Sequence, residues 1–369
     1  MPIPMLDLRA QYASIKAEVD AAVLNVLESQ QFRGGPVLES FENGLAEFAG
    51  VRHAVGVGSG TDALYLALKA LPLNPGDEVI TSPFTFFATA GAIVNAGGIP
   101  VFADVEADTF MLDPERVACL ITPRTRAIIA VHLFGQCAAM EDLRDICAQH
   151  GLALIEDAAQ ALGATRNGCA VGAWGVAAAL SFYPTKNLGA AGEGGAILTN
   201  DDAMATSLRL LRCHGAAALY QHAIVGTNSH LHAIQAAVLE VKLKYLRQWN
   251  DARRARARHY TESLGGVPGV RTPAEASGNH HVYHQYVIRL PERDLARQLL
   301  TERGIGCGVF YPLPLHRQPC FIPYVQPGVA CPNADAASAE VLALPMYPEL
   351  SSENQNIVIQ ALIDHVKRL

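Results

Sequence analysis

Short apolar runs alternate with longer segments whose apolar residues recur at helical spacing over the first two thirds of the chain. The short runs predict buried strands, and the spaced segments predict helices that cover them. The expected strands are 54–57, 78–81, 100–103, 126–133, 152–155 and 176–180. The expected helices are 13–29, 37–48, 63–70, 84–95, 114–120, 140–150 and 201–213. This alternation predicts a mostly parallel sheet with helices on both faces, an α/β/α arrangement.

The pattern changes in the last third of the chain. A helical pattern over 231–247 continues to about residue 264 and predicts one long helix that links two domains. Beyond it lie shorter elements, with strands expected at 281–290, 305–311 and 342–345, and helices at 293–303 and 352–369. We therefore expect a large α/β domain over residues 1–247 and a small α+β domain over residues 248–369.

Composition narrows the class of protein. Half of the 369 residues are hydrophobic, the net charge is −7, and no basic run stands out, which argues against nucleic acid as a partner. Apolar runs stay shorter than the roughly 18 residues of a membrane span. The N-terminus lacks a basic stretch followed by an apolar one, so we expect no signal peptide.

The eight cysteines are scattered, without a CxxC pair or a His/Cys ligand spacing. Scattered thiols in a chain of this size are typical of a reducing compartment, and the expected location is the cytoplasm. The same spacing argues against a metal site.

One lysine stands at a position where chemistry is expected. The buried run 176–180 leads into the segment 181–189 (SFYPTKNLG), where Pro184 ends the strand and Lys186 follows among small residues. Burial disfavours the ammonium form, so such a lysine can act as a nucleophile or move a proton. A surface lysine in a loop is the alternative at this point.

Two further clusters follow expected strands. The turn 58–62 (GSGTD) joins a strand to a helix and exposes backbone N–H groups at a positive helix end, which suits a phosphate. A tight turn capped by Thr61 or Asp62 is the alternative. Asp157 follows the strand 152–155, either to approach a ligand or to cap a helix. Because ligands of parallel sheets bind beyond the carboxyl ends of the strands, all three clusters should share one edge.

An anion site, a strand-end carboxylate and a strand-end lysine are together the groups that pyridoxal phosphate needs. With these residues in place, the chain resembles the DegT/DnrJ/EryC1/StrS family of sugar aminotransferases, pyridoxal-phosphate enzymes with the aspartate-aminotransferase fold (fold type I). The resemblance extends from residue 6 nearly to the C-terminus. Its landmarks are 59–64 (SGTDAL), 75–80 (PGDEVI), 85–86 (TF), 131–136 (VHLFGQ), 156–160 (EDAAQ), 181–195, 226–228 (GTN), 235–237 (QAA) and 311–316 (YPLPLH).

The resemblance implies a role for each cofactor-site residue. Lys186 would bind the aldehyde of the cofactor covalently and then move a proton, and Asp157 would pair with the pyridinium nitrogen. Gln160 would hydrogen-bond the ring hydroxyl, and Phe86 would stack on the ring unless it only packs in the core. The phosphate would be held by three residues, Gly60, Thr61 and Ser181.

The resemblance also implies partners. Asn228 would reach the phosphate in the neighbouring subunit, which makes the functional unit a homodimer with shared active sites. The expected reaction moves an amino group from L-glutamate to a keto sugar on a nucleoside diphosphate. Tyr311 and His316, and less directly Tyr183, stand where the family contacts its substrate; a buried, hydrogen-bonded ring is the alternative for each.

The chain departs from the family pattern at His230, where arginine is usual, and at His232, where an acid is usual. In the family this arginine contacts a substrate carboxylate, either of the amino donor or of a uronic-acid sugar, so His230 is a substrate-binding candidate. Histidine cannot bind a carboxylate bidentately as arginine does, so we expect a sugar without a C6 carboxylate. How glutamate is bound stays open. The segment 182–189 is more similar to members that act at C3 than to those that act at C4. The choice of UDP or dTDP stays open, and the product is expected to serve polysaccharide, lipopolysaccharide or glycosylated-metabolite synthesis.

Two other classes within the family are weighed against transamination. Sugar dehydratases use the same cofactor with a histidine in place of the lysine, and Lys186 argues against them. A non-catalytic or regulatory relative is expected to lose Lys186 or Asp157, and both are present.

Overall fold

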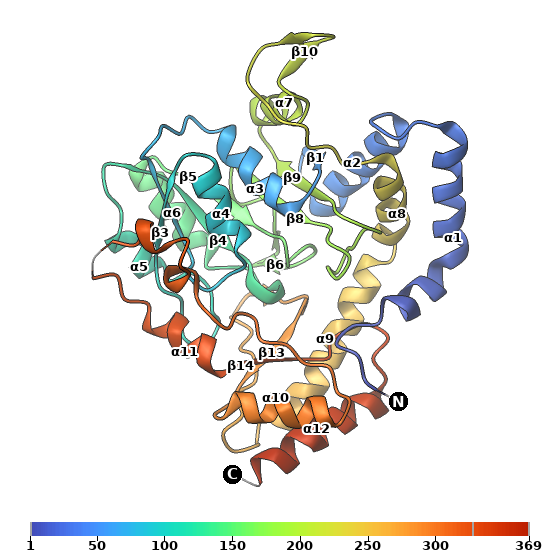
Figure 1. The fold of residues 1–369 in the computed structure, drawn as a ribbon, viewed down its shortest axis with the longest axis vertical. Coiled ribbons are helices and arrows are strands. Elements are labelled where there is room, and N and C mark those ends of the chain that lie inside the picture. The colour runs from blue at the N-terminus through green and yellow to red at the C-terminus, as the bar shows by residue number, and fades with distance from the viewer. Residues whose placement is uncertain (1, 327, 368–369) are drawn as a thin grey trace.

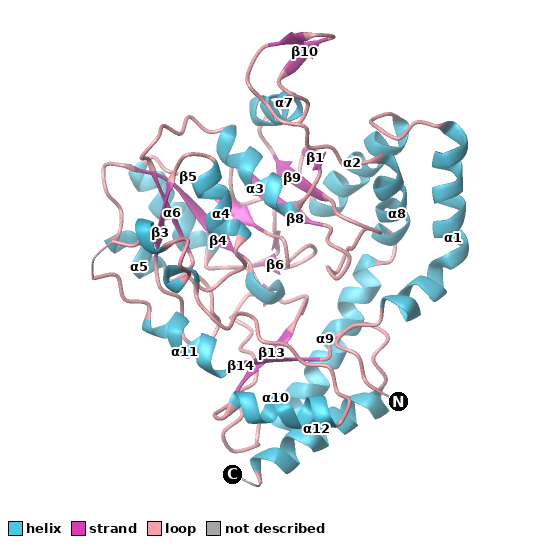
Figure 2. Cartoon of the chain, viewed as in Figure 1, coloured by secondary structure: helices cyan, strands magenta, loops and turns pink. Residues whose placement is uncertain are grey.

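A seven-stranded sheet forms the centre of the larger part of the molecule (Figures 1 and 2). The computed structural model describes residues 2–326 and 328–367. The strand order is β1-β9-β8-β5-β4-β2-β3, and only β9 runs antiparallel to its neighbours. The strands are β1 His53–Val57, β2 Glu78–Thr81, β3 Ile99–Phe102, β4 Thr125–Val131, β5 Ala153–Asp157, β8 Ala177–Ser181 and β9 Gly195–Thr199. The predicted mostly parallel α/β sheet is confirmed.

Helices cover both faces of this sheet because its strands are apolar on both sides. Ala177 and Ala179 pack with α3, α4 and α7, whereas Ala178 and Leu180 pack with α2 and α8 on the opposite face. The helices here are α1 Leu8–Ser29, α2 Pro36–Ala49, α3 Gly60–Lys69, α4 Ala88–Asn95, α5 Pro114–Cys119, α6 Met140–His150, α7 Asp202–Leu211 and α8 Ala233–Leu243. Residues of opposite parity along a strand face opposite sides, which produces this two-sided burial.

A second hydrophobic cluster lies below the sheet in Figure 1. It joins two antiparallel strands to three helices: β13 Tyr286–Arg289, β14 Val341–Leu344, α9 Leu246–Leu264, α10 Arg293–Glu302 and α12 Ser352–Val366. Helix α11, Pro332–Glu340, packs instead on the core beneath β2–β5. The division at residue 247 remains a prediction. The expected end of the last helix at residues 368–369 lies outside the described residues.

The prediction of one long helix over 231–264 is wrong. The helix is interrupted at Lys244 and Tyr245, between α8 and α9. Helix α8 packs against α1 and α2, whereas α9 packs against α12. The interruption allows the two helices to pack in different hydrophobic clusters.

Two strand predictions near the sheet also need correction. Residues 305–311 form no strand and contribute only single bridges, Ile305 to Ile3 and Gly308 to Ala343. The expected strand 281–290 shortens to β13, because Tyr283 adopts a positive φ of 42° just before it. Strand β9 does not follow from the sequence pattern, since the glycines at 192–195 indicate a turn.

The remaining strands are short and form two small sheets. One has three strands in the order β12-β6-β7, and the other is the β10–β11 hairpin. Their bounds are β6 Thr165–Arg166, β7 Cys169–Ala170, β10 Ala216–Ala218, β11 Gln221–His222 and β12 Asn279–His280. The β10–β11 hairpin stands away from the sheet at the top of Figure 1. Its turn exposes Leu219 and Tyr220. Among the described residues, no helix combines the length and the apolar character needed to cross a membrane.

Candidate active site

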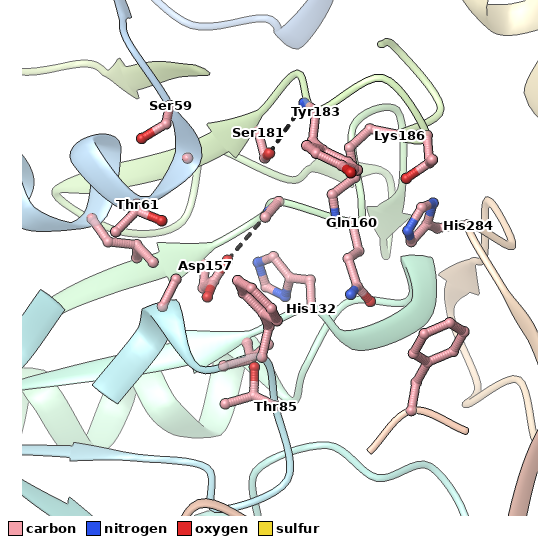
Figure 3. A pocket seen from close by; sticks show the side chains of 18 of the residues that line it. Ser59, Thr61, Thr85, His132, Asp157, Gln160, Ser181, Tyr183, Lys186 and His284 are labelled. Carbon is pink, nitrogen blue, oxygen red and sulfur yellow. Dashed lines mark hydrogen bonds between the residues drawn. The ribbon is translucent and has the colours of Figure 1, made fainter. Parts of the chain in front are cut away.

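A cavity of about 520 Å³ opens at the carboxyl ends of the parallel strands (Figure 3). Strands β1 and β8 are parallel because each is antiparallel to β9, and β5 pairs parallel with β8. The three polar clusters predicted to meet at one edge do meet here. The predicted site residues that line the cavity are Gly60, Thr61, Phe86, Asp157, Gln160, Ser181, Tyr183, Lys186 and Tyr311.

The turn between β1 and α3 forms one end of the cavity. Ser59 caps α3 by accepting from the backbone N–H of Asp62 at 3.1 Å, so the alternative of a turn capped by Thr61 or Asp62 is wrong about the capping residue. A Cβ atom on Gly60 would lie 2.6 Å from Cβ of Ser181, so only glycine lets the turn approach β8 this closely. The positive end of α3 therefore faces the cavity beside Ser181.

Asp157, at the end of β5, carries a buried carboxylate that is 6% exposed. Its Oδ2 accepts from the hydroxyl of Thr89 at 2.7 Å, and its Oδ1 accepts from the N–H of Ala159 at 3.3 Å. Burial raises the pKa of this carboxyl, while the two donors and Lys186 oppose the rise. The helix-cap alternative is wrong because no helix begins directly after Asp157; the next element in the chain is the strand β6.

Lys186 follows β8 and lines the same cavity. Its backbone N–H donates to the carbonyl of Tyr183 at 2.9 Å, which holds the loop in a tight turn. Burial lowers the pKa of the Lys186 amine to about 8, although the nearby Asp157 carboxylate works in the opposite direction. The surface-lysine alternative is therefore wrong, and the amine loses its proton more readily than that of an exposed lysine.

Gln160 joins the cavity to the segment around residue 311. Its Oε1 accepts from the N–H of Phe134 at 2.6 Å, and its Nε2 donates to the hydroxyl of Tyr311 at 3.1 Å. One amide hydrogen thus remains for a ligand. Phe86 is 56% exposed at the cavity and lies near the Tyr311 ring, so the core-packing alternative is wrong for it.

Three predicted site residues lie outside the cavity lining of this chain. Asn228 forms an isolated antiparallel β-bridge with Cys213. His230 is half-buried, and burial lowers the pKa of its ring to about 4. The neighbouring Ser229 holds this segment against the turn at the start of α3, because its hydroxyl donates to Oδ2 of Asp62 at 2.8 Å. His316 is buried, with Nε2 3.4 Å from Oδ1 of Asp335, so the burial expected in the alternative is present but, among the described residues, its hydrogen bond is not.

Sequence reasoning missed several polar residues of the cavity. His132 and His284 line it, and Thr89 supports Asp157 from α4. His132 Nδ1 accepts from the N–H of Ala138 at 3.1 Å, so Nε2 carries the proton and donates to Glu156 at 2.9 Å. His132 stands in the VHLFGQ motif, whereas Thr89 and His284 belong to no motif that marks them as site residues.

The fold and cavity together define an aminotransferase-like α/β protein with a lysine and an aspartate at adjacent strand ends. Residues 13–363 match the DegT/DnrJ/EryC1/StrS aminotransferase family, and the chain belongs to this family.

Relatives are similar over nearly the whole chain. A "pleiotropic regulatory protein" of Geobacillus stearothermophilus is 47% identical, covering 99% of this chain and 98% of its own length. The dTDP-3-amino-3,4,6-trideoxy-alpha-D-glucose transaminase of Streptomyces venezuelae is 43% identical, covering 100% and 97%. The crystal structure of S. venezuelae DesV superimposes with a TM-score of 0.97 at 42% identity, covering 100% and 99%. The aspartate-aminotransferase-like fold prediction is confirmed.

Proposed function

We propose that this protein is a pyridoxal-phosphate-dependent transaminase that moves an amino group from L-glutamate to a 3-keto nucleotide sugar. The observation that carries the proposal is that Lys186 and Asp157 line one cavity beside the N-terminus of α3 and influence each other's charge. The S. venezuelae transaminase, whose name specifies a 3-amino sugar linked to dTDP, supports the class of substrate and the position.

The residues present fit pyridoxal phosphate. Gly60 brings the N-terminus of α3 close to Ser181 at the cavity, and a helix N-terminus binds phosphate through its backbone N–H groups. Asp157 is a buried carboxylate with two neutral donors, so it lacks a cationic hydrogen-bond partner of the kind a pyridinium N–H supplies. Bound there, the cofactor supplies an electron sink for the carbon that gains or loses the amino group.

The chain's own residues divide the remaining work. Lys186 would attach the cofactor through its uncharged amine and afterwards move a proton at Nζ. Asp157 would keep the ring nitrogen protonated, and Gln160 would use its remaining amide hydrogen to orient the ring. Phe86 and Tyr183, both exposed at the cavity, would cover the faces of the ligands and exclude water.

The two other classes are less well supported. A dehydratase of the family would lack the lysine at position 186. The name of the G. stearothermophilus relative suggests a regulatory role. A non-catalytic protein, however, does not require a lysine and an aspartate with shifted pKa values in the lining of one cavity. Transamination uses both residues.

The sugar is proposed to lack a C6 carboxylate. His230 is uncharged at neutral pH, because burial and the nearby arginines Arg33 and Arg212 lower the pKa of its ring to about 4. An uncharged imidazole gives a carboxylate far less stabilisation than a guanidinium does. A UDP- or dTDP-linked neutral sugar is therefore the expected acceptor, with a 4-keto sugar as the second candidate.

We propose further that the active unit is a cytoplasmic homodimer. Asn228 lies outside its own cavity, as expected if it serves the cofactor phosphate in a partner subunit. Leu219 and Tyr220 in the turn of the β10–β11 hairpin, and Val225 after it, are exposed apolar side chains that a partner would cover. Mixing Lys186→Ala and Asn228→Ala subunits should restore activity, since half of the mixed dimers' sites are then intact. Unchanged inactivity in verified mixed dimers would contradict sharing.

The central experiment follows the absorbance of the lysine-bound cofactor. L-glutamate should abolish the absorbance, and a 3-keto nucleotide sugar should restore it; Lys186→Ala should show neither change. Mass spectrometry and NMR of the product then identify the aminated carbon. Failure of the wild-type protein to respond to both substrates would overturn the proposal, and preferred use of a 4-keto or uronic-acid sugar would overturn its details.

A further inference from the structure

His284 presents an unpaired ring nitrogen to the cavity beside Lys186. The ring is 8% exposed, lines the cavity and lies on the same side as Lys186 in Figure 3. Its side chain makes one hydrogen bond among the described residues, from Nδ1 to Oδ1 of Asn187 at 3.2 Å. No role for this histidine follows from the functions assigned above.

A chain of amides fixes the tautomer of His284. Asn250 donates its amide to the carbonyl of Leu162 at 3.1 Å, so its Oδ1 is an acceptor. Asn187 donates one amide hydrogen to that oxygen at 2.8 Å and the other to the carbonyl of Val282 at 3.1 Å. Both hydrogens of Asn187 are then used, and its Oδ1 can only accept. Nδ1 of His284 must therefore carry the proton, which leaves Nε2 with a lone pair.

The charge of the ring is fixed as well. Burial, together with the nearby cations Lys186 and Arg253, holds the pKa of His284 well below its usual range. The ring is therefore neutral throughout the pH range in which Lys186 titrates, and Nε2 is an acceptor and never a donor.

The backbone that carries His284 is held rigidly. The guanidinium of Arg253, itself 2% exposed, donates to the carbonyls of Tyr283 and His284, both at 3.2 Å, and to that of Met346 at 3.0 Å. Gly135 packs against the same backbone: a Cβ atom on it would lie 3.0 Å from the backbone nitrogen of His284. Burying a guanidinium costs free energy, which its hydrogen bonds to carbonyl groups partly offset. Here those hydrogen bonds fix the backbone that carries the His284 imidazole.

We propose that His284 is a positioning residue for Lys186: its Nε2 accepts a hydrogen from the lysine amine and so directs the amine lone pair toward the reacting carbon. The inference rests on the proposed function of Lys186. No bond is broken by His284 and no proton is transferred to it. Its contribution is to restrict the amine to one orientation during proton transfer, the kind of geometric control to which rates are sensitive.

The first test uses His284→Phe, which keeps a ring but removes both nitrogens, and His284→Gln, whose amide oxygen can accept. The reaction of the holoenzyme with L-glutamate should slow about 10- to 100-fold in His284→Phe. The isotope effect with α-deuterated glutamate should increase, KM for the sugar should stay unchanged, and His284→Gln should recover part of the rate. His280→Phe, a neighbouring histidine outside the cavity, is the matched control.

The second test requires no turnover. In cofactor-free protein, the pH dependence of Lys186 modification by a small amine reagent, read by peptide mapping, reports the pKa of the amine. An acceptor favours the ammonium form, so His284→Phe should lower this pKa below that of the wild type, while Asp157, the charged group that also faces Lys186, is unchanged.

Each outcome has a separate meaning. An unchanged Lys186 pKa together with an unchanged glutamate rate in His284→Phe would overturn the inference. A rise confined to KM for the sugar would also overturn it, because His284 would then contact the substrate. If the wild type fails to transaminate, the proposed function fails, but the labelling test still reports whether His284 and Lys186 interact.

Discussion

Asp157 and Lys186 face one cavity from adjacent parallel strands, and each shifts the pKa of the other. The carboxylate raises the pKa of the amine, and the ammonium lowers that of the carboxyl, while burial acts in the opposite direction on both. The pair is close enough to couple, yet neither group is neutralised by a direct ion pair in the described residues. Both groups thus remain available to a ligand placed between them.

Thr89 should be needed to keep Asp157 ionised. Thr89→Val keeps the shape of the side chain and removes the hydroxyl that donates to Oδ2 at 2.7 Å, so the pKa of Asp157 should rise further. We expect the affinity for pyridoxal phosphate to fall roughly tenfold, the equivalent of one lost hydrogen bond. Titration of cofactor-free protein, followed by absorbance, measures it. Thr206→Val on α7 is the control, and equal affinities of both variants would contradict the role.

Gly60→Ala should weaken phosphate binding through a clash. The new Cβ would lie 2.6 Å from Cβ of Ser181 and must push the start of α3 away from β8. We expect the affinity for pyridoxal phosphate and for free phosphate to fall by at least about tenfold, since the anion site depends on this close approach. Gly44→Ala on α2 is the matched control: its Cβ would meet only Leu243 at 3.8 Å, and stability should be equal or higher.

Glu156 should contribute to stability rather than to chemistry. Its oxygens accept from the His132 ring at 2.9 Å and from backbone N–H groups of three residues, Gly172, Trp174 and Gly175. Glu156→Gln turns an amide N–H toward these donors and should cost about 3 kcal/mol in the free energy of unfolding. Urea denaturation measures the loss, with the exposed Glu262→Gln as control. A change below about 1 kcal/mol would contradict this account.

Lys242 should make stability depend on pH. Its ammonium is buried against the carbonyl of Gly189 at 2.7 Å, and burial lowers its pKa from 10.5 to about 8. Between these values the unfolded chain binds more protons, so stability gains from raising the pH. Relative to Lys242→Met, wild-type stability should therefore rise by about 2 kcal/mol from pH 7 to pH 9.5. Urea denaturation at the two pH values tests this, and parallel pH curves for the two proteins would refute it.

The sequence predicted the sheet and most of the cavity for a clear reason. Buried parallel strands are short apolar runs, and their carboxyl ends share one edge, so the order of residues alone brings Asp157 and Lys186 together. The predictions of a helix across Lys244 and of a strand at 305–311 were wrong. Local periodicity does not show where the chain leaves one hydrophobic core and begins to pack against another.

Local sequence by itself determined the alternation of strands and helices, the glycine turn at Gly60 and the lysine at the end of β8, since each depends on the order of a few neighbouring residues. Only the tertiary structure decided which side chains support them. Thr89 reaches Asp157 from another helix, and His284 reaches Asn187 from 97 positions away in the chain. Hydrogen bonds and burial depend on distances in space, and packing of remote segments sets those distances.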